Sequence, residues 1–295
     1  MDKYKTRSTI EKTPFLSTFI STNKNGKKRL NIRFFRWISI ISINLLFVLS
    51  YRVDFQVLEG SLSGSRFFGF HLIDPFISLQ MLLAHHSLYV NLVIGTLTIL
   101  VFYFFVGGRA FCSWVCPYNI LGEISEKIHR YLIGKKLIKS HEFNNKIRYI
   151  FWAIFLFFAF FAGYLVFEII NPVGILSRFI VYGWSLAIVF VLTLFLFETF
   201  VSQRAWCRYV CPLGVTYSFL GWASVTKIKW TDKCDHCNVC TNVCMVPHVL
   251  KVTKDKDNTK SEVSIMSGDC TLCGRCVEVC HTDALSYETK LKKLI

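Results

Sequence analysis

Four long apolar stretches divide this chain, separated by polar segments of very different lengths. They run from Phe34 to about Ser50, from Tyr89 to Val106, from Tyr149 to Ile169 and from Phe179 to Val201. A membrane-spanning helix needs roughly 17 to 25 mostly apolar residues, so each stretch predicts one span. A secretory signal is the competing interpretation of the first stretch. Because Tyr51-Arg52-Val53-Asp54 offers no small-residue cleavage site, we interpret that stretch as an uncleaved anchor.

The basic residues between the spans predict their orientation. Loops 52–88 and 170–178 hold three arginines together, whereas the segment 107–148 holds eight lysines and arginines. Cytoplasmic loops carry the excess of positive charge, so both termini and all twelve cysteines are expected in the cytoplasm, with the spans in the inner membrane. Residues 1–33 are polar and basic without a helical apolar period, which predicts a mostly disordered cytoplasmic tail.

Composition supports a membrane protein. The 295 residues are 53% hydrophobic, with a mean hydropathy of +0.43, yet carry a formal net charge of +15. A nucleic-acid binder would explain the charge but not the hydropathy, so no nucleic-acid partner is expected and the lipid bilayer is. All twelve cysteines fall into spaced motifs with none left over, which suits metal ligation in a reducing compartment better than disulfides.

The last quarter of the chain carries the strongest motif, two tandem CxxCxxCxxxC runs. This is the ligand pattern of a bacterial-type ferredoxin with two [4Fe-4S] clusters, in which each run gives its last thiolate to the other cluster. Zinc ribbons pair CxxC with a distant CxxC or with histidines, so zinc and a disulfide framework are the weaker alternatives. The predicted ligands are Cys234, Cys237, Cys240 and Cys280 for cluster 1, and Cys270, Cys273, Cys276 and Cys244 for cluster 2.

Two details of this C-terminal segment add to the prediction. The proline that often follows the fourth cysteine of each run is replaced by Met245 and His281. The segment from Val249 to Ile265 has a polar centre and predicts two short strands around a turn.

An internal repeat supplies the remaining four cysteines. Residues 109–117, RAFCSWVCP, align with residues 204–212, RAWCRYVCP, at a constant offset of 95. Cysteines four apart share one helix face, and the proline after the second starts a new helix, so each CxxxCP forms an elbow at the cytoplasmic membrane edge. If the elbows meet, they form a third iron-sulfur or metal site from Cys112, Cys116, Cys207 and Cys211.

The arginine three residues before each CxxxCP, Arg109 or Arg204, would favour thiolates or balance a cluster's negative charge. The competing interpretation is two reduced, structural cysteine pairs whose arginines reach the membrane interface. Glu198, near the inner end of the fourth stretch, is then expected as an interfacial partner of Arg204.

The segment from Gly60 to Ser87 is too apolar for a free loop and is expected to lie in the outer interface, where it would cover a site for a lipid-soluble quinol. Quinol oxidation releases protons, so acceptors are needed nearby. The expected topology places candidates at the outer face; we select His71, Asp74 and Glu168, with His85 and His86 close by. Helix capping is the alternative role for Asp74, and for Asn171, because a proline follows each.

Other cofactors lack their motifs in this chain. None of the four apolar stretches contains a histidine, which argues against a haem held by two histidines within the membrane. The chain has no CxxCH for covalent haem, no glycine-rich dinucleotide fingerprint and no P-loop.

The patterns together predict a polytopic α-helical membrane protein. We expect the basic tail 1–33, a membrane domain 34–223 of four transmembrane helices with a two-fold internal repeat of helical hairpins, and a two-[4Fe-4S] ferredoxin domain 224–295. This organisation resembles the NapH family of membrane ferredoxin-type proteins, with NosH-like and MauN-like relatives. The motifs that carry the resemblance are Gly108 to Pro117, Arg204 to Pro212, Asp74-Pro75 with Leu79-Gln80, and Asn171-Pro172.

The resemblance implies an electron-transfer subunit acting as a quinol dehydrogenase. It would pass electrons from the membrane (mena)quinol pool towards a ferredoxin-type, NapG-like partner subunit and a periplasmic reductase, as in nitrate respiration. The alternative is an iron-sulfur accessory or scaffold protein that assembles or matures a periplasmic nitrate or nitrous oxide reductase without quinol turnover.

Overall fold

The computed structural model describes residues 20–22, 28–53, 58–62, 64–67, 70–86, 89–254 and 261–290. Most of the predicted disordered tail lies outside these residues. Its described part pairs strand β1 (Ile20–Thr22) with strand β2 (Lys28–Leu30) in antiparallel register, so the expectation of an irregular tail is wrong there.

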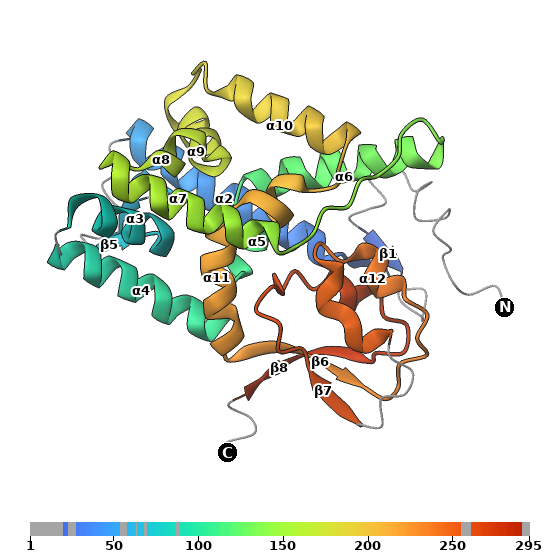
Figure 1. Cartoon of the computed structure of the whole chain (residues 1–295). Helices are drawn as coiled ribbons and strands as arrows, with labels where there is room; N and C mark the ends of the chain where they lie inside the picture. The colour runs from blue at the N-terminus through green and yellow to red at the C-terminus, as the bar shows by residue number, and fades with distance from the viewer. Residues whose placement is uncertain are drawn as a thin grey trace.

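The first three quarters of the chain form a helical domain, drawn from blue to orange in Figure 1. A short antiparallel sheet lies among the helices and packs against α2, α4 and α9. The helices are α2 (Ile32–Val53), α3 (Pro75–His85), α4 (Val90–Val106), α5 (Ala110–Trp114), α6 (Tyr118–Gly134), α7 (Ile147–Ala162), α8 (Val166–Ile170), α9 (Pro172–Tyr182), α10 (Ile188–Phe200), the π-helix η2 (Trp206–Val210) and α11 (Pro212–Ala223).

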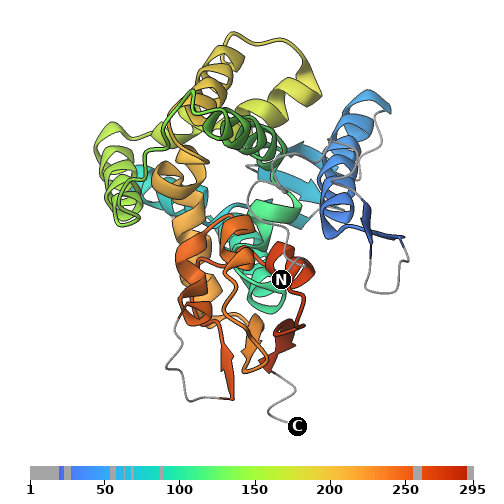
Figure 2. The same ribbon diagram turned by 90° about the vertical axis from the view of Figure 1, so that its right-hand side faces the viewer.

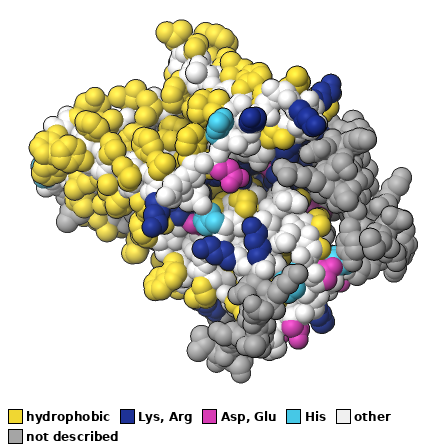
Figure 3. Space-filling model, turned by 45° about the vertical axis from the view of Figure 1, so that its right-hand side comes forward, with side chains coloured by type: hydrophobic (Ala, Val, Ile, Leu, Met, Phe, Trp, Pro, Cys, Tyr) yellow, Lys and Arg dark blue, Asp and Glu magenta, His cyan; other side chains and the backbone are white. Residues whose placement is uncertain are grey.

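Helix α2 is, in the described part of the chain, the one helix long and apolar enough to cross a membrane by length and composition. The other three predicted spans correspond to α4, α7 and α10, with 17, 16 and 13 residues. Large apolar side chains on these helices point outward, among them Leu97, Phe161 and Leu196. Figure 3 shows this hydrophobic surface over the helical part, while lysine and arginine side chains gather on the rest of that face.

Two of the predicted spans are interrupted at glycines. The stretch from Tyr149 to Ile169 was expected to be one helix, but α7 ends where Gly163 adopts a left-handed conformation and α8 is separate. The stretch from Phe179 to Val201 is likewise divided, because α9 ends at Gly183, which also has a positive φ. Glycine adopts such angles at little cost and commonly ends helices. An average of hydropathy does not register this local stop signal.

The expected interfacial loop from Gly60 to Ser87 is instead largely regular. It contains strands β3 (Leu58–Ser61), β4 (Gly64–Phe67) and β5 (Phe70–Ile73), followed directly by helix α3. Asp74 and Asn171 cap α3 and α9, because each Oδ1 accepts a hydrogen bond from the backbone N–H two residues on, at 2.8 and 3.1 Å. The capping interpretation is therefore confirmed for both residues.

The C-terminal module is built on a three-stranded antiparallel sheet in the order β7-β6-β8. Figure 2 shows it below the helical domain, joined to it through α11. Of the two strands expected between Val249 and Ile265, the second exists as β7, but the first is wrong because the chain forms the 3₁₀ helix η3 there. The elements are β6 (Thr226–Thr231), α12 (Val239–Val243), η3 (Pro247–Thr253), β7 (Glu262–Ser264), α13 (Arg275–Val279) and β8 (Leu285–Thr289).

Candidate iron-sulfur sites and quinol pocket

The two CxxCxxC loops of the C-terminal module have the same unusual backbone. In each, the residue before the second cysteine (His236 or Leu272) and the residue after it (Asn238 or Gly274) have positive φ angles. Left-handed residues alternating with ordinary ones curl the backbone so that its N–H groups form an anion-binding concavity, as at many iron-sulfur sites. A non-glycine residue in this conformation is uncommon, so its occurrence at corresponding positions indicates a built site. The loops therefore fit an anionic cluster.

The cysteines predicted for cluster 2 lie around one cavity, with apolar walls from Ile228, Val249 and Ile265. The sulfurs on this cavity are those of Cys244, Cys270, Cys273 and Cys276. Of the cysteines predicted for cluster 1, Cys240 is close enough to both Cys237 and Cys234 for their charges to interact. The fold thus juxtaposes thiols from both runs.

The spacing of the sulfurs disfavours a mononuclear metal. All twelve cysteines lie in the described part of the chain, and no three of their sulfurs lie within 4.8 Å of one another. Four thiolates around one zinc ion, with bonds of about 2.3 Å, would lie roughly 3.8 Å apart. A four-iron cluster needs wider spacing, so the arrangement fits clusters better than zinc.

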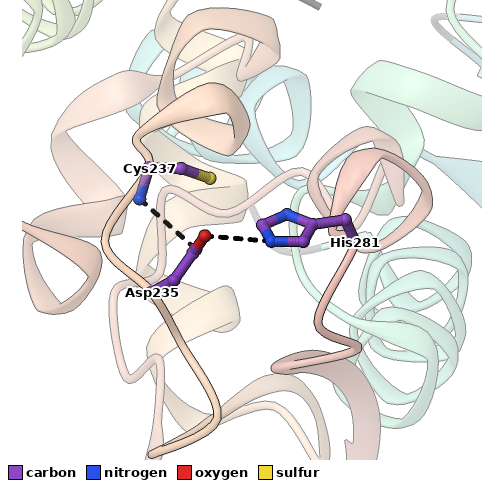
Figure 4. A group of neighbouring side chains, drawn as sticks. All are labelled: Asp235, Cys237 and His281. Carbon is purple, nitrogen blue, oxygen red and sulfur yellow. Dashed lines mark hydrogen bonds and ion pairs between the residues drawn. The ribbon is translucent and has the colours of Figure 1, made fainter. Parts of the chain in front are cut away.

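Cluster 1 is the more exposed of the two sites. Cys237 is the one exposed thiol among the twelve cysteines, all of which are described. Figure 4 shows it beside Asp235 and His281, whose Oδ2 and Nε2 lie 2.9 Å apart. The Asp235 Oδ1 also accepts a hydrogen bond from the Cys237 N–H at 3.4 Å. His281 therefore covers the loop edge at the position where proline was expected.

Both elbows break their helix at the second cysteine, as predicted. The N–H of Cys116 donates to the carbonyl of Phe111 at 3.1 Å, and that of Cys211 to the carbonyl of Trp206 at 2.9 Å. These are five-residue spacings, wider than an α-helical turn, and such π-type turns occur often at functional sites. Proline then follows, and α6 and α11 begin directly after or at it.

The fold brings the two elbows together. The four elbow cysteines belong to one packed core, in which Cys116 is close enough to both Cys207 and Cys211 for their charges to interact. Cys112 and Cys211 are neighbours in the same sense. The Arg109 guanidinium contacts Cys112 and donates to the carbonyl of Cys207 at 3.4 Å.

The arginines of both elbows are buried, so the competing interpretation, in which they reach the membrane interface, is wrong. Arg204 pairs with Glu126 at 2.7 Å and with Asn119 at 2.9 Å, rather than with Glu198. Glu198 is buried as well, and its Oε1 accepts a hydrogen bond from the Trp206 N–H at 3.0 Å. Glu198 therefore supports the second elbow and is not an interfacial residue.

A buried ionic network adjoins the elbow of Cys207 and the cluster 2 loop. Glu123 and Glu126 pair with five arginines, and Glu198 and Glu278 also lie close enough for their charges to act on these arginines, which are Arg33, Arg36, Arg130, Arg204 and Arg275. Burial opposes ionisation of Glu123, yet the arginines lower its pKa to about 2. They hold the pKa of Glu126 well below its usual range.

Several guanidinium nitrogens near the cysteines have no hydrogen-bond partner although they are buried. They belong to Arg36, Arg109, Arg148 and Arg204. A buried N–H donor without a partner is costly even where the rest of its guanidinium is ion-paired, so these groups fit a site that holds anions. Iron-sulfur clusters with four thiolate ligands are such anions, and the residues present fit them.

The three predicted quinol residues lie in different environments. Asp74 is buried against the elbows, where its Oδ2 accepts a hydrogen bond from the Tyr217 hydroxyl at 3.0 Å. Its charge interacts with the thiols of Cys112 and Cys211. The expectation that Asp74 lies at the outer face, across the membrane from the elbows, is therefore wrong. The reason is that α3 begins inside the molecule rather than at its edge.

Glu168 lines a pocket of about 430 Å³. It pairs with Arg178 at 3.4 Å and is close enough for its charge to act on Asp74. The pocket is lined by His85, Gly163, Tyr164, Leu165, Glu168, Ile169 and Arg178. Sequence reasoning did not select Arg178, although it is the one basic residue of the loop 170–178.

His71 is not brought to this pocket. It lies on β5, opposite Arg66 of β4, and its backbone packs against Gly95 of α4. There a Cβ on Gly95 would lie 2.5 Å from the His71 carbonyl oxygen, so the close contact requires glycine. His86, the C-cap of α3, packs against the ring of Phe160 and is also absent from the pocket lining.

Comparison with known proteins agrees with these sites. A family described as "4Fe-4S binding domain" matches residues 89–139 and again 182–231, and each match contains one elbow. A family described as "4Fe-4S dicluster domain" matches residues 233–284. No solved structure matches the chain.

Relatives with similar sequences are ferredoxin-type proteins. The protein NapH of Escherichia coli is 34% identical over 263 residues, covering 86% of this chain and 90% of NapH. NapH of Haemophilus influenzae is 32% identical over 260 residues, covering 87% and 89%. The methylamine utilization protein MauN of Paracoccus denitrificans is 32% identical over 221 residues, covering 73% and 75%.

The fold, the cysteine loops and the matched domains define an iron-sulfur electron-transfer protein of the ferredoxin type. The aligned regions cover most of each relative's length as well as most of this chain. The chain belongs to the NapH/MauN family of ferredoxin-type proteins.

Proposed function

We propose that this protein oxidises a membrane quinol and passes the electrons to a ferredoxin-like partner subunit that serves a periplasmic reductase, such as nitrate reductase. The observation that carries the proposal is the position of Asp74. Its charge interacts both with the pocket residue Glu168 and with the elbow thiols of Cys112 and Cys211. A carboxylate in range of both sites suits a reaction in which proton release accompanies electron release.

The pocket has the size and lining that a quinol head group requires. Its volume of about 430 Å³ lies within the usual range of roughly 300 to 1,000 Å³ for small-molecule sites. Tyr164, Leu165 and Ile169 supply apolar walls, while Glu168 and Arg178 supply an acceptor and a donor. We expect Arg178 to donate to one ring oxygen and Glu168 to accept from the hydroxyl on the other.

Oxidation of a quinol to a quinone releases two electrons and two protons. Glu168 would accept the first proton and His85, which also lines the pocket, the second. The oxidant is an iron-sulfur centre, and iron-sulfur clusters, when bound, take up electrons one at a time. Asp74 would stabilise protons that move from Glu168 into the interior. The Tyr217 hydroxyl, which donates a hydrogen bond to the Asp74 Oδ2, would keep the carboxylate in place.

The cysteines divide into three sets by position. We assign Cys234, Cys237, Cys240 and Cys280 to cluster 1, and Cys270, Cys273, Cys276 and Cys244 to cluster 2. The cavity shared by the second set supports that assignment. We assign the elbow set Cys112, Cys116, Cys207 and Cys211 to a third iron-sulfur centre, supported by their convergence and by the two "4Fe-4S binding domain" matches.

These sets form a continuous route through the molecule. The elbows adjoin the cluster 2 loop, since the Ser113 hydroxyl of α5 donates to the Thr271 carbonyl at 2.6 Å. Helix α12, which carries Cys240, packs against α13, which carries Cys276, and these two cysteines are close enough for their charges to interact. Cys237 faces the surface and provides the contact point for a partner ferredoxin. Along this route, electrons from a quinol bound in the helical domain would reach the exposed cluster 1.

We also propose that α2, α4, α7 and α10 cross the inner membrane, with the termini and the cysteine module in the cytoplasm. The outward-facing apolar side chains on these helices support this arrangement, as do the basic residues between α4 and α7. The short helices α3 and α9 would then be half-helices inside the domain, related by the internal repeat.

Anaerobic stopped-flow spectroscopy tests the function. Full-length protein in lipid nanodiscs is mixed with a reduced menaquinone analogue, and cluster bleaching is followed with and without the partner subunit. We expect bleaching in the wild-type protein and a large rate loss in Glu168→Gln. Absence of cluster reduction in the wild type, with and without partner, would refute quinol oxidation and favour a scaffold role in reductase assembly.

A further inference from the structure

Asp269 directly precedes Cys270, the first cysteine of the cluster 2 loop, and its carboxylate has four polar or charged side-chain partners. Its Oδ2 lies 2.5 Å from Arg148 and 2.7 Å from His248, and its Oδ1 accepts a hydrogen bond from the Ser218 hydroxyl at 2.6 Å. Arg109 approaches the same Oδ1 at 3.5 Å and the Asp269 carbonyl at 3.3 Å. Burial would raise the pKa of Asp269, but these partners hold it well below its usual range.

The partners of Asp269 come from both parts of the molecule. Arg109 stands at the start of α5, Arg148 lies in α7 and Ser218 in α11, all in the helical domain, whereas His248 belongs to η3 of the C-terminal module. One carboxylate therefore joins three helical elements to the module. Because it is charged and nearly buried, losing it would leave two arginines without compensation.

Arg109 extends this contact to the elbows. Its guanidinium also touches Cys112 of the first elbow and the carbonyl of Cys207 in the second. Two further α5 side chains hold the same loop, because Ser113 donates to the Thr271 carbonyl and the Trp114 Nε1 to the Leu272 carbonyl at 3.2 Å. The loop between Cys270 and Cys273 is thus bound along its length to the helix that carries Cys112.

We propose that Asp269 and Arg109 are positioning residues that hold cluster 2 against the elbow site and set its reduction potential. The pair places one negative and one positive group directly at the cluster 2 loop, where the charge of Arg109 acts on Cys270. The inference rests on the assignment of Cys244, Cys270, Cys273 and Cys276 to cluster 2. It does not depend on quinol oxidation.

The two members of the pair have opposite charge, so opposite effects are expected. Asp269→Asn removes a negative charge and leaves Arg109 and Arg148 uncompensated, which stabilises the reduced cluster and raises the cluster 2 potential. Arg109→Gln removes a positive charge and lowers that potential. The cluster 1 potential should stay unchanged in both variants, so it provides an internal reference.

The test is a redox titration followed by electron paramagnetic resonance on anaerobically purified full-length protein, with iron content measured in parallel. Asp269→Glu should restore the wild-type potentials, and Asp235→Asn, beside Cys237, should leave cluster 2 unaffected. Shifts of one cluster in opposite directions support the proposal. Loss of cluster 2 alone from both variants also supports it, since the pair then holds that cluster.

Three outcomes would overturn the proposal: unchanged potentials in both variants, shifts in the same direction, or equal disturbance of both clusters. Same-direction shifts would mean that the substitutions merely loosen the module and admit water. Because no quinol is present in the titration, a failure of quinol oxidation would not affect these results, and the two proposals can fail independently.

Discussion

The Tyr217 hydroxyl donates a hydrogen bond to the Oδ2 of Asp74 at 3.0 Å, across 143 positions of the chain. The other oxygen of Asp74 caps α3 through the Phe76 N–H at 2.8 Å. One carboxylate therefore closes the start of α3 and contacts α11 directly behind the second elbow. The cap needs only a side-chain oxygen, whereas the proposed role in proton release needs the charge of the carboxylate.

Substitutions at Asp74 should separate these two roles. Asp74→Asn keeps a capping oxygen, so we expect nearly wild-type stability but a loss of quinol-dependent cluster reduction of at least about tenfold. Asp74→Ala also loses the cap, at a cost of about 1 kcal/mol in the free energy of unfolding. Asn171→Ala removes the corresponding cap of α9, together with the hydrogen bond from the Asn171 Nδ2 to Glu168 at 3.2 Å, and is a comparison for stability only. Equal reduction rates in wild type and Asp74→Asn would remove Asp74 from the proton route.

Glu168→Gln should slow cluster reduction by quinol about 100-fold or more, because a neutral amide cannot accept the proton. Binding of an oxidised quinone analogue, measured by fluorescence quenching, should change far less. Glu142→Gln replaces an exposed glutamate away from the pocket and should behave like wild type. A rate for Glu168→Gln within about twofold of wild type would argue against the pocket.

Glu123→Gln should destabilise the protein by about 3 kcal/mol at pH 7, since it breaks a buried network and leaves Arg36 uncompensated. The pKa of Glu123 is lowered to about 2 in the folded protein, so its stabilising contribution is full above the unfolded pKa near 4.5 and is lost as the pH falls towards 2. Denaturant unfolding in detergent should show the difference between wild type and variant shrinking across that window. A difference that is independent of pH would contradict the pairing of Glu123.

The double variant Cys112→Ser with Cys211→Ser should reduce iron and acid-labile sulfide per protein, while about eight irons of clusters 1 and 2 remain. The elbow cysteines belong to a different apolar core from the other eight cysteines, so those clusters should keep their spectra. Cys237→Ser, at the exposed edge of cluster 1, provides the comparison in which a ferredoxin cluster is disturbed. Unchanged iron in the double variant would assign the elbows a structural role.

Structural features that involve residues close together in the sequence can be predicted from the sequence of this protein. Ligand spacing in the two cysteine runs, the caps at Asp74 and Asn171, and the helix break at each CxxxCP all depend on residues within a few positions of one another. Local sterics and hydrogen bonds act over that range, so a pattern of letters predicts them. The early helix ends at Gly163 and Gly183 belong to the same class, but averaging hydropathy over a whole stretch concealed them.

The long-range relationships were decided by the tertiary structure alone. Asp74 accepts a hydrogen bond from Tyr217, and Asp269 has partners in four elements. Arg204 pairs with Glu126, although Glu198 is closer to it in the sequence. These contacts depend on how helices pack, and a buried charge selects the partner that best compensates its desolvation rather than the one closest in sequence. The sequence alone therefore determined which residues bear the chemistry, and packing decided that the two elbows meet and that the first of them contacts the cluster 2 loop.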